Sequence, residues 1–372
     1  MTRPRAGRGS AILLAAALIG PIGATVGSAQ SRRSARDAPP VVPFQGTLAE
    51  ARSLASDRHV PLLVLVIYED DAWDPKDHHD QVELIAAVQS DRDLAQPLER
   101  ALVALACNRV HELETIEVGE GEARRTVKRC PSYHTDSCSV HQRLFEDAYV
   151  AWNTDGALVS PYVALLAPDG EIRMRRDDGS SPSGKELRAA IEKAQERAGL
   201  GLTAAEHARV LGLCADGRAA AQRKLHGNAW RAWDAVLGVT QNTRYAEEAR
   251  AGSEAALAGM ATVREQARGE VAAGHAVEGY RLLVELQEQA QGTPIERDLA
   301  KEVRALETDK AHREAIQAFK REREAAALLA EVETLFAAGD ERRARAKLRG
   351  LLRRYRDTEA AAQARERWPD GG

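Results

Sequence analysis

The hydrophobic pattern divides the chain into two parts of different character. From residue 44 to about residue 198, short apolar runs of strand length alternate with stretches that repeat apolar positions at helical spacing. The strand candidates are PLLVLVIYE (61–69) and ALVALACN (101–108). The helical candidates are TLAEARSLASDRH (47–59), HHDQVELIAAVQS (78–90) and VHQRLFEDAYVAW (140–152).

A hairpin and a last helix complete this first part. In YVALLAPDGEIRMRR (162–176), the PDG triplet supplies turn residues between two strand-like runs. The stretch SGKELRAAIEKAQERAG (183–199) opens with Ser183 as an N-cap and ends at Gly199, as a helix does. A strand–helix–strand unit followed by a hairpin and a helix predicts an α/β domain over 44–198, a mixed sheet with helices on both faces.

The second part, residues 199–372, lacks strand patterns and is rich in Ala, Glu, Arg and Leu. Three stretches that begin at Gly227, Gly274 and Gly339 share a layout of one helix, a Thr-containing break and a second helix. Small or apolar residues recur at matching places, nine residues after each Gly (Val236, Leu283, Leu348) and six after each Thr (Ala249, Leu299, Ala364). This layout predicts an all-α helical-repeat or bundle domain that resembles TPR repeats.

The first residues have the three parts of a signal peptide. Arg3, Arg5 and Arg8 precede the apolar run AILLAAALIGPIGATVG, and Gly27 and Ala29 suit a cleavage site after Ala29. We therefore expect residues 1–29 to direct export to the periplasm or the exterior, and the polar, Pro-rich residues 30–43 to be a linker. Membrane contact is expected only through this segment, if it stays uncleaved.

Composition and net charge limit the classes of partner that the chain is expected to bind. The chain has 372 residues and a net charge of −4, which gives no overall electrostatic footprint for nucleic acid. It has four cysteines, Cys107, Cys130, Cys138 and Cys214, which an oxidising compartment could pair. Cys214 falls on the apolar side of a predicted helix and is expected to be buried there.

Residues 44–198 resemble a thioredoxin-fold domain. The stretches that carry the resemblance are TLAEARSLASDRHVPLLVLVIYEDDAW, ALVALACN, SPYVALLAPDG and GKELRAAIEKA. The resemblance implies that Pro161 is the cis-proline beside the active corner. In that fold the backbone next to the proline pairs with an extended peptide substrate, so a protein or peptide partner is implied here too.

The resemblance fails at the residues that carry the usual chemistry. When Trp73 is matched to the Trp of the family, Asp74 and Asp77 stand where the two cysteines would be. Disulfide exchange needs one thiolate to attack and a second sulfur to resolve the mixed disulfide, and carboxylates do neither. Trp73, Asp74, Asp77 and Pro161 are therefore candidates for binding and not for dithiol catalysis.

Other thiols are expected at the same edge of the sheet. Cys107 ends the second parallel strand, and the carboxyl ends of parallel strands meet at one edge. The irregular segment that follows carries Cys130, His134, Cys138 and His141, in the order C-x3-H-x3-C-x2-H. Three interpretations fit this cluster: a Cys130–Cys138 disulfide that pins the loop, a redox pair drawn from Cys107, Cys130 and Cys138, or zinc or copper held by the two cysteines and two histidines.

These interpretations give three hypotheses for function. The first is an exported protein- or peptide-binding module that has lost the dithiol centre and needs no cofactor. The second is a thiol-disulfide oxidoreductase that uses the relocated cysteines. The third is a zinc- or copper-binding protein. A nucleotide-binding loop is not expected, because GEGEARRT lacks the strand-to-helix placement and the Gly-Lys-Ser/Thr ending.

Overall fold

The structure is a computed structural model that describes residues 43–70, 73–74, 76, 78–118, 124–153 and 159–369. The expected signal segment (1–29), most of the linker and Asp77 lie outside the described residues. Within the described ranges, no helix is both long and apolar enough to cross a membrane.

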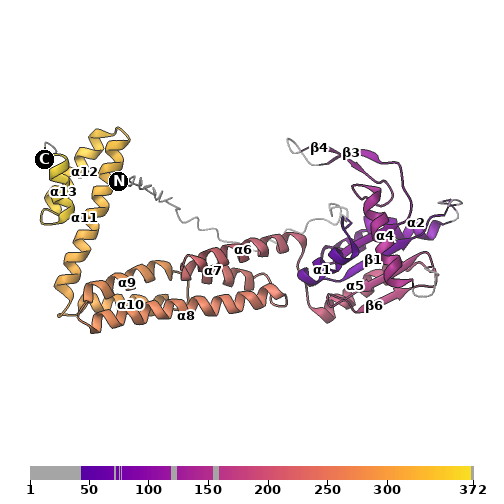
Figure 1. The fold of residues 1–372 in the computed structure, drawn as a ribbon, viewed down its shortest axis with the longest axis horizontal. Coiled ribbons are helices and arrows are strands. Elements are labelled where there is room, and N and C mark those ends of the chain that lie inside the picture. Colours follow the sequence, from indigo (N-terminus) through magenta and orange to yellow (C-terminus); the bar gives the residue numbers. More distant parts are fainter. Residues whose placement is uncertain are drawn as a thin grey trace, which may run out of the picture. The chain divides into compact units, whose positions relative to one another are not determined.

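A four-stranded mixed sheet lies at the centre of the N-terminal part (Figure 1). Its strands run in the order β2-β1-β5-β6: β1 (Leu62–Ile67) pairs in parallel with β2 (Leu102–Cys107) and antiparallel with β5 (Tyr162–Leu166), which pairs antiparallel with β6 (Ile172–Arg176). Every residue of β1, β2 and β5 is buried, because helices cover both faces. The sequence therefore predicted the mixed sheet and the β5–β6 hairpin correctly.

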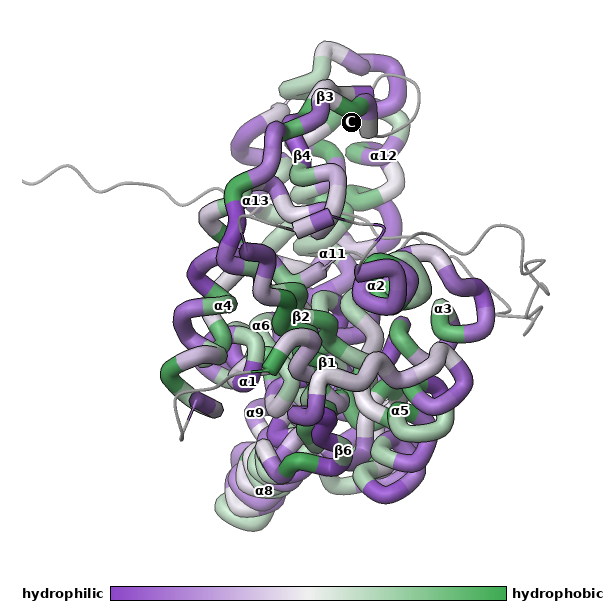
Figure 2. Tube along the Cα trace, turned by 90° about the vertical axis from the view of Figure 1, so that its right-hand side faces the viewer, coloured by the Kyte–Doolittle hydropathy of each residue, from purple (hydrophilic) through white to green (hydrophobic). Residues whose placement is uncertain are grey.

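Two apolar cores lie on the two faces of this sheet. On one face, alternate residues of β1 such as Leu63 and Leu65 pack with α2 (His79–Ser90), α3 (Arg92–Glu99) and α5 (Gly184–Ala198). On the other face, Leu62 and Val64 pack with α1 (Leu48–Arg58) and α4 (Cys138–Trp152). In Figure 2, the green colour of the trace at β2 marks its residues as hydrophobic. Successive side chains of a strand point to opposite faces, so one apolar run serves both cores.

Local caps fix the ends of the outer helices. Thr47 and Ser183 precede α1 and α5, and each forms a capping box with a Glu three residues later, Glu50 or Glu186. Gly199 ends α5 with φ 86°, as its position after the last helical residue predicted.

The segment between β2 and α4 differs from the expectation. The sequence predicted an irregular stretch, but the structure has a two-stranded antiparallel sheet of β3 (Glu114–Val118) and β4 (Arg125–Arg129). Ile116 pairs with Val127, and polar residues occupy most other positions of the ribbon. A two-stranded ribbon is marginally stable by itself, so its attachment to the domain needs a further source of stability.

The C-terminal part is entirely helical in its described residues (Figure 1). Three apolar clusters run along it, so each group of helices packs mainly with its sequence neighbours. Figure 2 shows alternating purple and pale green along α8, as expected for amphipathic helices. The helices are α6 (Ala204–Gln222), α7 (His226–Leu237), α8 (Arg244–Ala272), α9 (Ala276–Gln289), α10 (Glu296–Thr308), α11 (Arg313–Ala337), α12 (Glu341–Arg354) and α13 (Glu359–Arg367).

The three helical hairpins share a register that differs from the one expected from glycine. Lys224, Gly274 and Gly339 stand two residues before α7, α9 and α12, and all three have a left-handed backbone with φ between 57° and 88°. Gly227, which anchored the expected first copy, lies inside α7. The buried residue equivalent to Leu283 and Leu348 is therefore Trp233, whereas Val236 corresponds to Leu286 and Leu351.

Candidate metal centre

Four metal-ligating side chains converge at the carboxyl edge of β2. They are His111, Cys130, Cys138 and His141, and their ligand atoms all lie within 4.8 Å of one another. The side chain of His111 is 17% exposed, Cys138 is 6% exposed, and Cys130 and His141 are fully buried. The group combines two sulfurs and two imidazoles around one point shielded from solvent.

Three separate segments supply these side chains. His111 lies in the loop that leaves β2, and Cys130 directly follows β4, so the β3–β4 hairpin returns the chain to its starting point. A tight turn follows Cys130, with bonds from Cys130 N to Thr135 O (2.8 Å) and from His134 N to Cys130 O (2.9 Å). This turn leads into α4, where Cys138 and His141 share the first turn and face the same side.

The hydrogen bonds of the two histidines fix which ring nitrogen is free. His111 Nε2 donates to Glu69 Oε2 (3.1 Å), and His141 Nδ1 donates to the backbone oxygen of Cys107 (3.1 Å). Because each of these nitrogens faces an acceptor, it carries the proton, and the other nitrogen has a lone pair. His111 Nδ1 and His141 Nε2 are thus buried lone pairs, and neither has a hydrogen-bond partner among the described residues.

Two unsatisfied lone pairs in one cluster need an explanation. Leaving a buried acceptor unpaired costs about 1–3 kcal/mol. Histidines that bind metals characteristically donate their second nitrogen to a carboxylate or a backbone carbonyl, as His111 and His141 do here. Burial also lowers the pKa of His141, which favours the neutral imidazole that a metal requires.

The sulfurs also have surroundings that suit metal ligation. Cys138 Sγ accepts the backbone N–H of His111 (3.2 Å) and donates its proton to His111 O (3.3 Å). Cys130 Sγ accepts backbone N–H groups of Ser132 and Tyr133, but burial still raises the pKa of its thiol. A thiolate in this environment needs a nearby positive charge, and a bound cation supplies one. All four cysteines of the chain are free thiols in the structure.

His134 does not join the group that the sequence placed it in. Its backbone has φ 54°, and the four-residue group contains His111 in its place. The local spacing suggested His134, because it lies between the two cysteines. The signal for His111 was its position four residues after Cys107, on the loop that leaves the same sheet edge.

Cys107 belongs to a neighbouring polar network. Glu69 Oε1 accepts the Tyr133 hydroxyl (2.7 Å) and the Cys107 thiol (3.5 Å), while Glu69 Oε2 accepts from His111. Burial raises the pKa of Cys107 to about 12, so the thiol stays protonated at neutral pH. Glu69, Cys107 and His111 are also close enough to hold an ion. Since these groups already satisfy one another by hydrogen bonds, we interpret the network as the support of the first group.

The corner after β1 forms the rim of a pocket next to this network. Trp73 stacks on His78 with ring centroids 4.0 Å apart, and Asp74 Oδ1 caps the exposed turn by accepting from Lys76 N (2.9 Å). A pocket of about 490 Å³ lies between this corner and the turn that follows Cys130. It is lined by Glu69, Trp73, Val82, Ile85, Ala86, Gln89, Arg109, His111, Pro131, Ser132 and Tyr133. Pro131, Ser132 and Tyr133, which directly follow Cys130 in the sequence, thus line the same pocket as Trp73.

Pro161 is close to the same corner. The Ser160–Pro161 peptide bond is cis, as the resemblance implied, and Pro161 is buried at the start of β5. Tyr68 N donates to Ser160 Oγ (2.9 Å), and Ser160 Oγ donates to Gln81 Oε1 (3.1 Å). The proline segment is thereby tied to the end of β1 and to α2.

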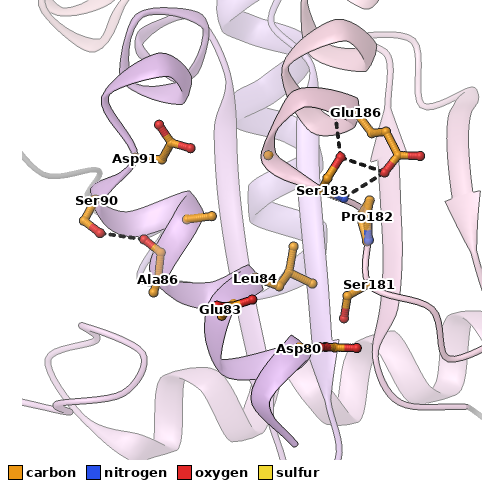
Figure 3. Close-up of a pocket in the computed structure, with 12 residues that line it drawn as sticks. Asp80, Glu83, Leu84, Ala86, Ser90, Asp91, Ser181, Pro182, Ser183 and Glu186 are labelled. Carbon is orange, nitrogen blue, oxygen red and sulfur yellow. Dashed lines mark hydrogen bonds between the residues drawn. The ribbon is translucent and has the colours of Figure 1, made fainter.

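A second pocket of about 640 Å³ lies between α2 and the start of α5 (Figure 3). Its carboxylates include Asp80, Glu83 and Glu186, and the Glu186 side chain is engaged in the Ser183 capping box. His79, Asp80 and Glu83 form an exposed group here that could meet a cation. None of them is buried, so this surface lacks the features that distinguish the four-residue group.

No family model matches the chain, and no curated protein matches it.

Proposed function

We propose that the protein binds one zinc ion through His111 Nδ1, Cys130 Sγ, Cys138 Sγ and His141 Nε2. The observation that carries this proposal is the pair of buried, partnerless lone pairs that share a site with two thiols. Four protein ligands complete a tetrahedral shell and leave no open position, which is characteristic of structural zinc.

The donor set favours zinc over Cu²⁺. Two thiolates with two imidazoles in tetrahedral arrangement suit Zn²⁺, whereas Cu²⁺ prefers square-planar or tetragonal ligation by nitrogen and oxygen. Zinc bonds of about 2.3 Å to sulfur and about 2.0 Å to nitrogen place tetrahedral donors roughly 3.3–3.8 Å apart. The ligand atoms lie within 4.8 Å of one another, so binding requires any two of them to approach by no more than about 1.5 Å.

A bound zinc ion would fasten the β3–β4 hairpin to the domain. His111 and Cys130 flank the hairpin, and the other two ligands belong to α4, which packs on the sheet. The metal thereby supplies the attachment that a lone two-stranded ribbon needs. It also fixes the Pro131–Tyr133 wall of the 490 Å³ pocket beside Trp73.

We further propose that the α/β domain is thioredoxin-like and serves as a protein- or peptide-binding module. Support comes from the strand order β2-β1-β5-β6, the cis Ser160–Pro161 bond, the closing helix α5 and Trp73 after β1. Several apolar side chains around this corner are exposed, namely Tyr68 (50%), Val82 (40%) and Val159 (42%). Exposed apolar groups beside a pocket are typical of binding surfaces.

The same environment argues against a thiol-disulfide oxidoreductase. The attacking species in disulfide exchange is a thiolate, and burial raises the pKa of both Cys107 and Cys130. Export, which residues 1–29 suggest, stays a prediction, because those residues lie outside the described structure.

The metal proposal is tested by comparing His111→Ala with His134→Ala. The full chain is purified without chelators, and zinc and copper are measured by mass spectrometry against protein concentration. We expect one zinc per chain in the parent and in His134→Ala, and a loss of at least 90% in His111→Ala. Equal loss in both variants, or retention in both, contradicts the ligand set. Far-UV circular dichroism of each variant checks that the chain is folded.

The binding proposal is tested with extended peptides selected on the parent protein from a random display library. Trp73→Ala and Val82→Ser should weaken binding of a selected peptide about tenfold or more. Val150→Ser is the matched control, because Val150 is 84% exposed on α4 and lies outside the pocket lining. Selected peptides that bind all three variants equally would rule out this surface.

A further inference from the structure

The two thiols of the candidate centre can react with each other as well as with a metal. Their sulfurs lie within 4.8 Å, whereas a disulfide needs an S–S length of about 2.05 Å. Both thiols are free in the structure, and the seven residues 131–137 separate them in the sequence. A loop of this size can close through a disulfide, so small shifts of the Cys130 turn and the start of α4 would join the two sulfurs.

We propose that the centre is a redox switch, in which oxidation of Cys130 and Cys138 to a disulfide expels the zinc ion. The inference rests on the proposed zinc site. It assigns the disulfide and the metal complex to two states of the same four residues.

The reaction balances with a low-molecular-weight disulfide as oxidant. One zinc-bound thiolate attacks a sulfur of the oxidant, forms a mixed disulfide and releases one small thiolate. The second protein thiolate attacks the protein sulfur of the mixed disulfide, closes the Cys130–Cys138 bond and releases the other small thiolate. The two protein sulfurs lose two electrons, the oxidant gains them, and Zn²⁺ leaves without changing its oxidation state.

Loss of both sulfurs removes half of the ligand shell. The remaining imidazoles, His111 and His141, form a two-ligand site that is far weaker than a closed tetrahedral one. The histidines keep their bonds to Glu69 and to the Cys107 carbonyl, so the site can bind zinc again after reduction. The switch is therefore expected to be reversible.

Cys107 lies near the centre but is not expected to take part. Its thiol donates to the Glu69 carboxylate and receives the Arg109 N–H on sulfur (3.4 Å). It is fully buried and outside the four-ligand group. Cys214→Ser offers a matched control, since Cys214 is a buried thiol of α6 in the helical part, and its removal leaves the pair and the supporting network intact.

The test uses the full chain loaded with one zinc and treated with increasing glutathione disulfide. A chromophoric zinc indicator measures the released ion, and alkylation with mass spectrometry maps the disulfide. We expect one zinc released for each Cys130–Cys138 disulfide, in the parent and in Cys214→Ser alike, and recovery of zinc binding after reduction. In reduced, zinc-free Cys138→Ser, the reaction should stop at a glutathione adduct on Cys130.

The outcomes separate this inference from the zinc proposal. If the reduced chain binds no zinc even after reconstitution, the zinc proposal itself fails. If zinc binds but stays bound while the Cys130–Cys138 disulfide forms, or if the oxidised pair includes Cys107 or Cys214, the switch is refuted and the zinc site stands. Resistance of both thiols to a large excess of oxidant refutes the switch as well.

Discussion

The α/β part and the helical part bury polar side chains in different ways. In the helical part, buried threonines bond to nearby atoms: Thr293 Oγ1 donates to Ala290 O and Thr358 Oγ1 to Tyr355 O, both at 2.6 Å. Each closes the break between two helices. In the α/β part, His111 and His141 each leave one ring nitrogen unpaired, and both nitrogens belong to one cluster of potential ligands.

This difference distinguishes buried polar groups that only stabilise the fold from buried polar groups that could bind a ligand. Single unsatisfied atoms occur elsewhere in both parts, but none of them belongs to a group of potential metal ligands among the described residues. They are Asn153 Oδ1, Tyr162 Oη, Arg173 Nε and Ser181 Oγ in the α/β part, and Ser253 Oγ and Gln289 Oε1 in the helical part. A buried polar group whose partner is a neighbouring backbone atom needs nothing more. Several that face one another without partners are what the proposed zinc site would satisfy.

The largest expected effect comes from removing zinc, and it should be confined to the α/β part. A metal present at about 1,000 times its Kd contributes roughly 4 kcal/mol of stability. For a domain of this size, that corresponds to a rise in Tm of about 10 °C. Differential scanning calorimetry of the zinc-loaded and chelated chain should show one transition that shifts and one, from the helices, that does not.

A common shift of both transitions would contradict the separation of the two parts, and no shift would contradict a stabilising metal. Separate transitions are expected because the buried apolar clusters of the sheet, residues 48–194, contain no residue of the helical clusters, residues 202–368.

How much the sequence predicted depended on how local each signal was. The β5–β6 hairpin and α5 were predicted correctly because a turn triplet and an N-cap mark them within a few residues. The β3–β4 ribbon was missed, because its short strands carry many charges and few apolar positions.

The candidate site was predicted only in part for the same reason. Cys138 and His141 lie three residues apart on a helix, so their spacing in the sequence was enough to predict that they face the same side. His111 reaches the site only because the ribbon brings residue 130 back beside residue 111, and that return cannot be read from local spacing. In the helical part, Lys224 occupies a left-handed position held by glycine in the other two copies, so an alignment anchored on glycine was shifted.

The next largest effect concerns packing in the helical part. Leu299 of α10 is fully buried in the cluster around Tyr280 and Leu283. Leu299→Ala should lower the free energy of unfolding of the helical transition by about 2–5 kcal/mol through the cavity it leaves. Zinc content should not change. Leu211→Ala is the control, because Leu211 is 44% exposed, and a cost there as large as at Leu299 would mean that the burial pattern is wrong.

The smallest effect tests how Glu69 supports the centre. The Glu69 carboxylate accepts a hydrogen bond from the His111 Nε2–H group. This bond holds the ring with Nδ1 directed at the other proposed ligands. In Glu69→Gln, the amide oxygen can still accept this bond, but the negative charge that makes the imidazole a better donor to the metal is lost. Such changes weaken metal binding about 10–100-fold, so the zinc Kd measured by chelator competition should rise by that factor.

Glu83→Gln is the matched control for Glu69→Gln. Glu83 is also an acidic residue paired with a histidine, His79 (3.5 Å), but both side chains are 68% exposed and contribute no ligand to the four-residue group. Its zinc Kd should equal that of the parent. If both variants weaken binding equally, the effect comes from net charge and not from the Glu69–His111 bond. If Glu69→Gln leaves the zinc Kd unchanged, the loop alone holds His111 in place. The unpaired ring nitrogens of His111 and His141 would then distinguish this site without any contribution from Glu69.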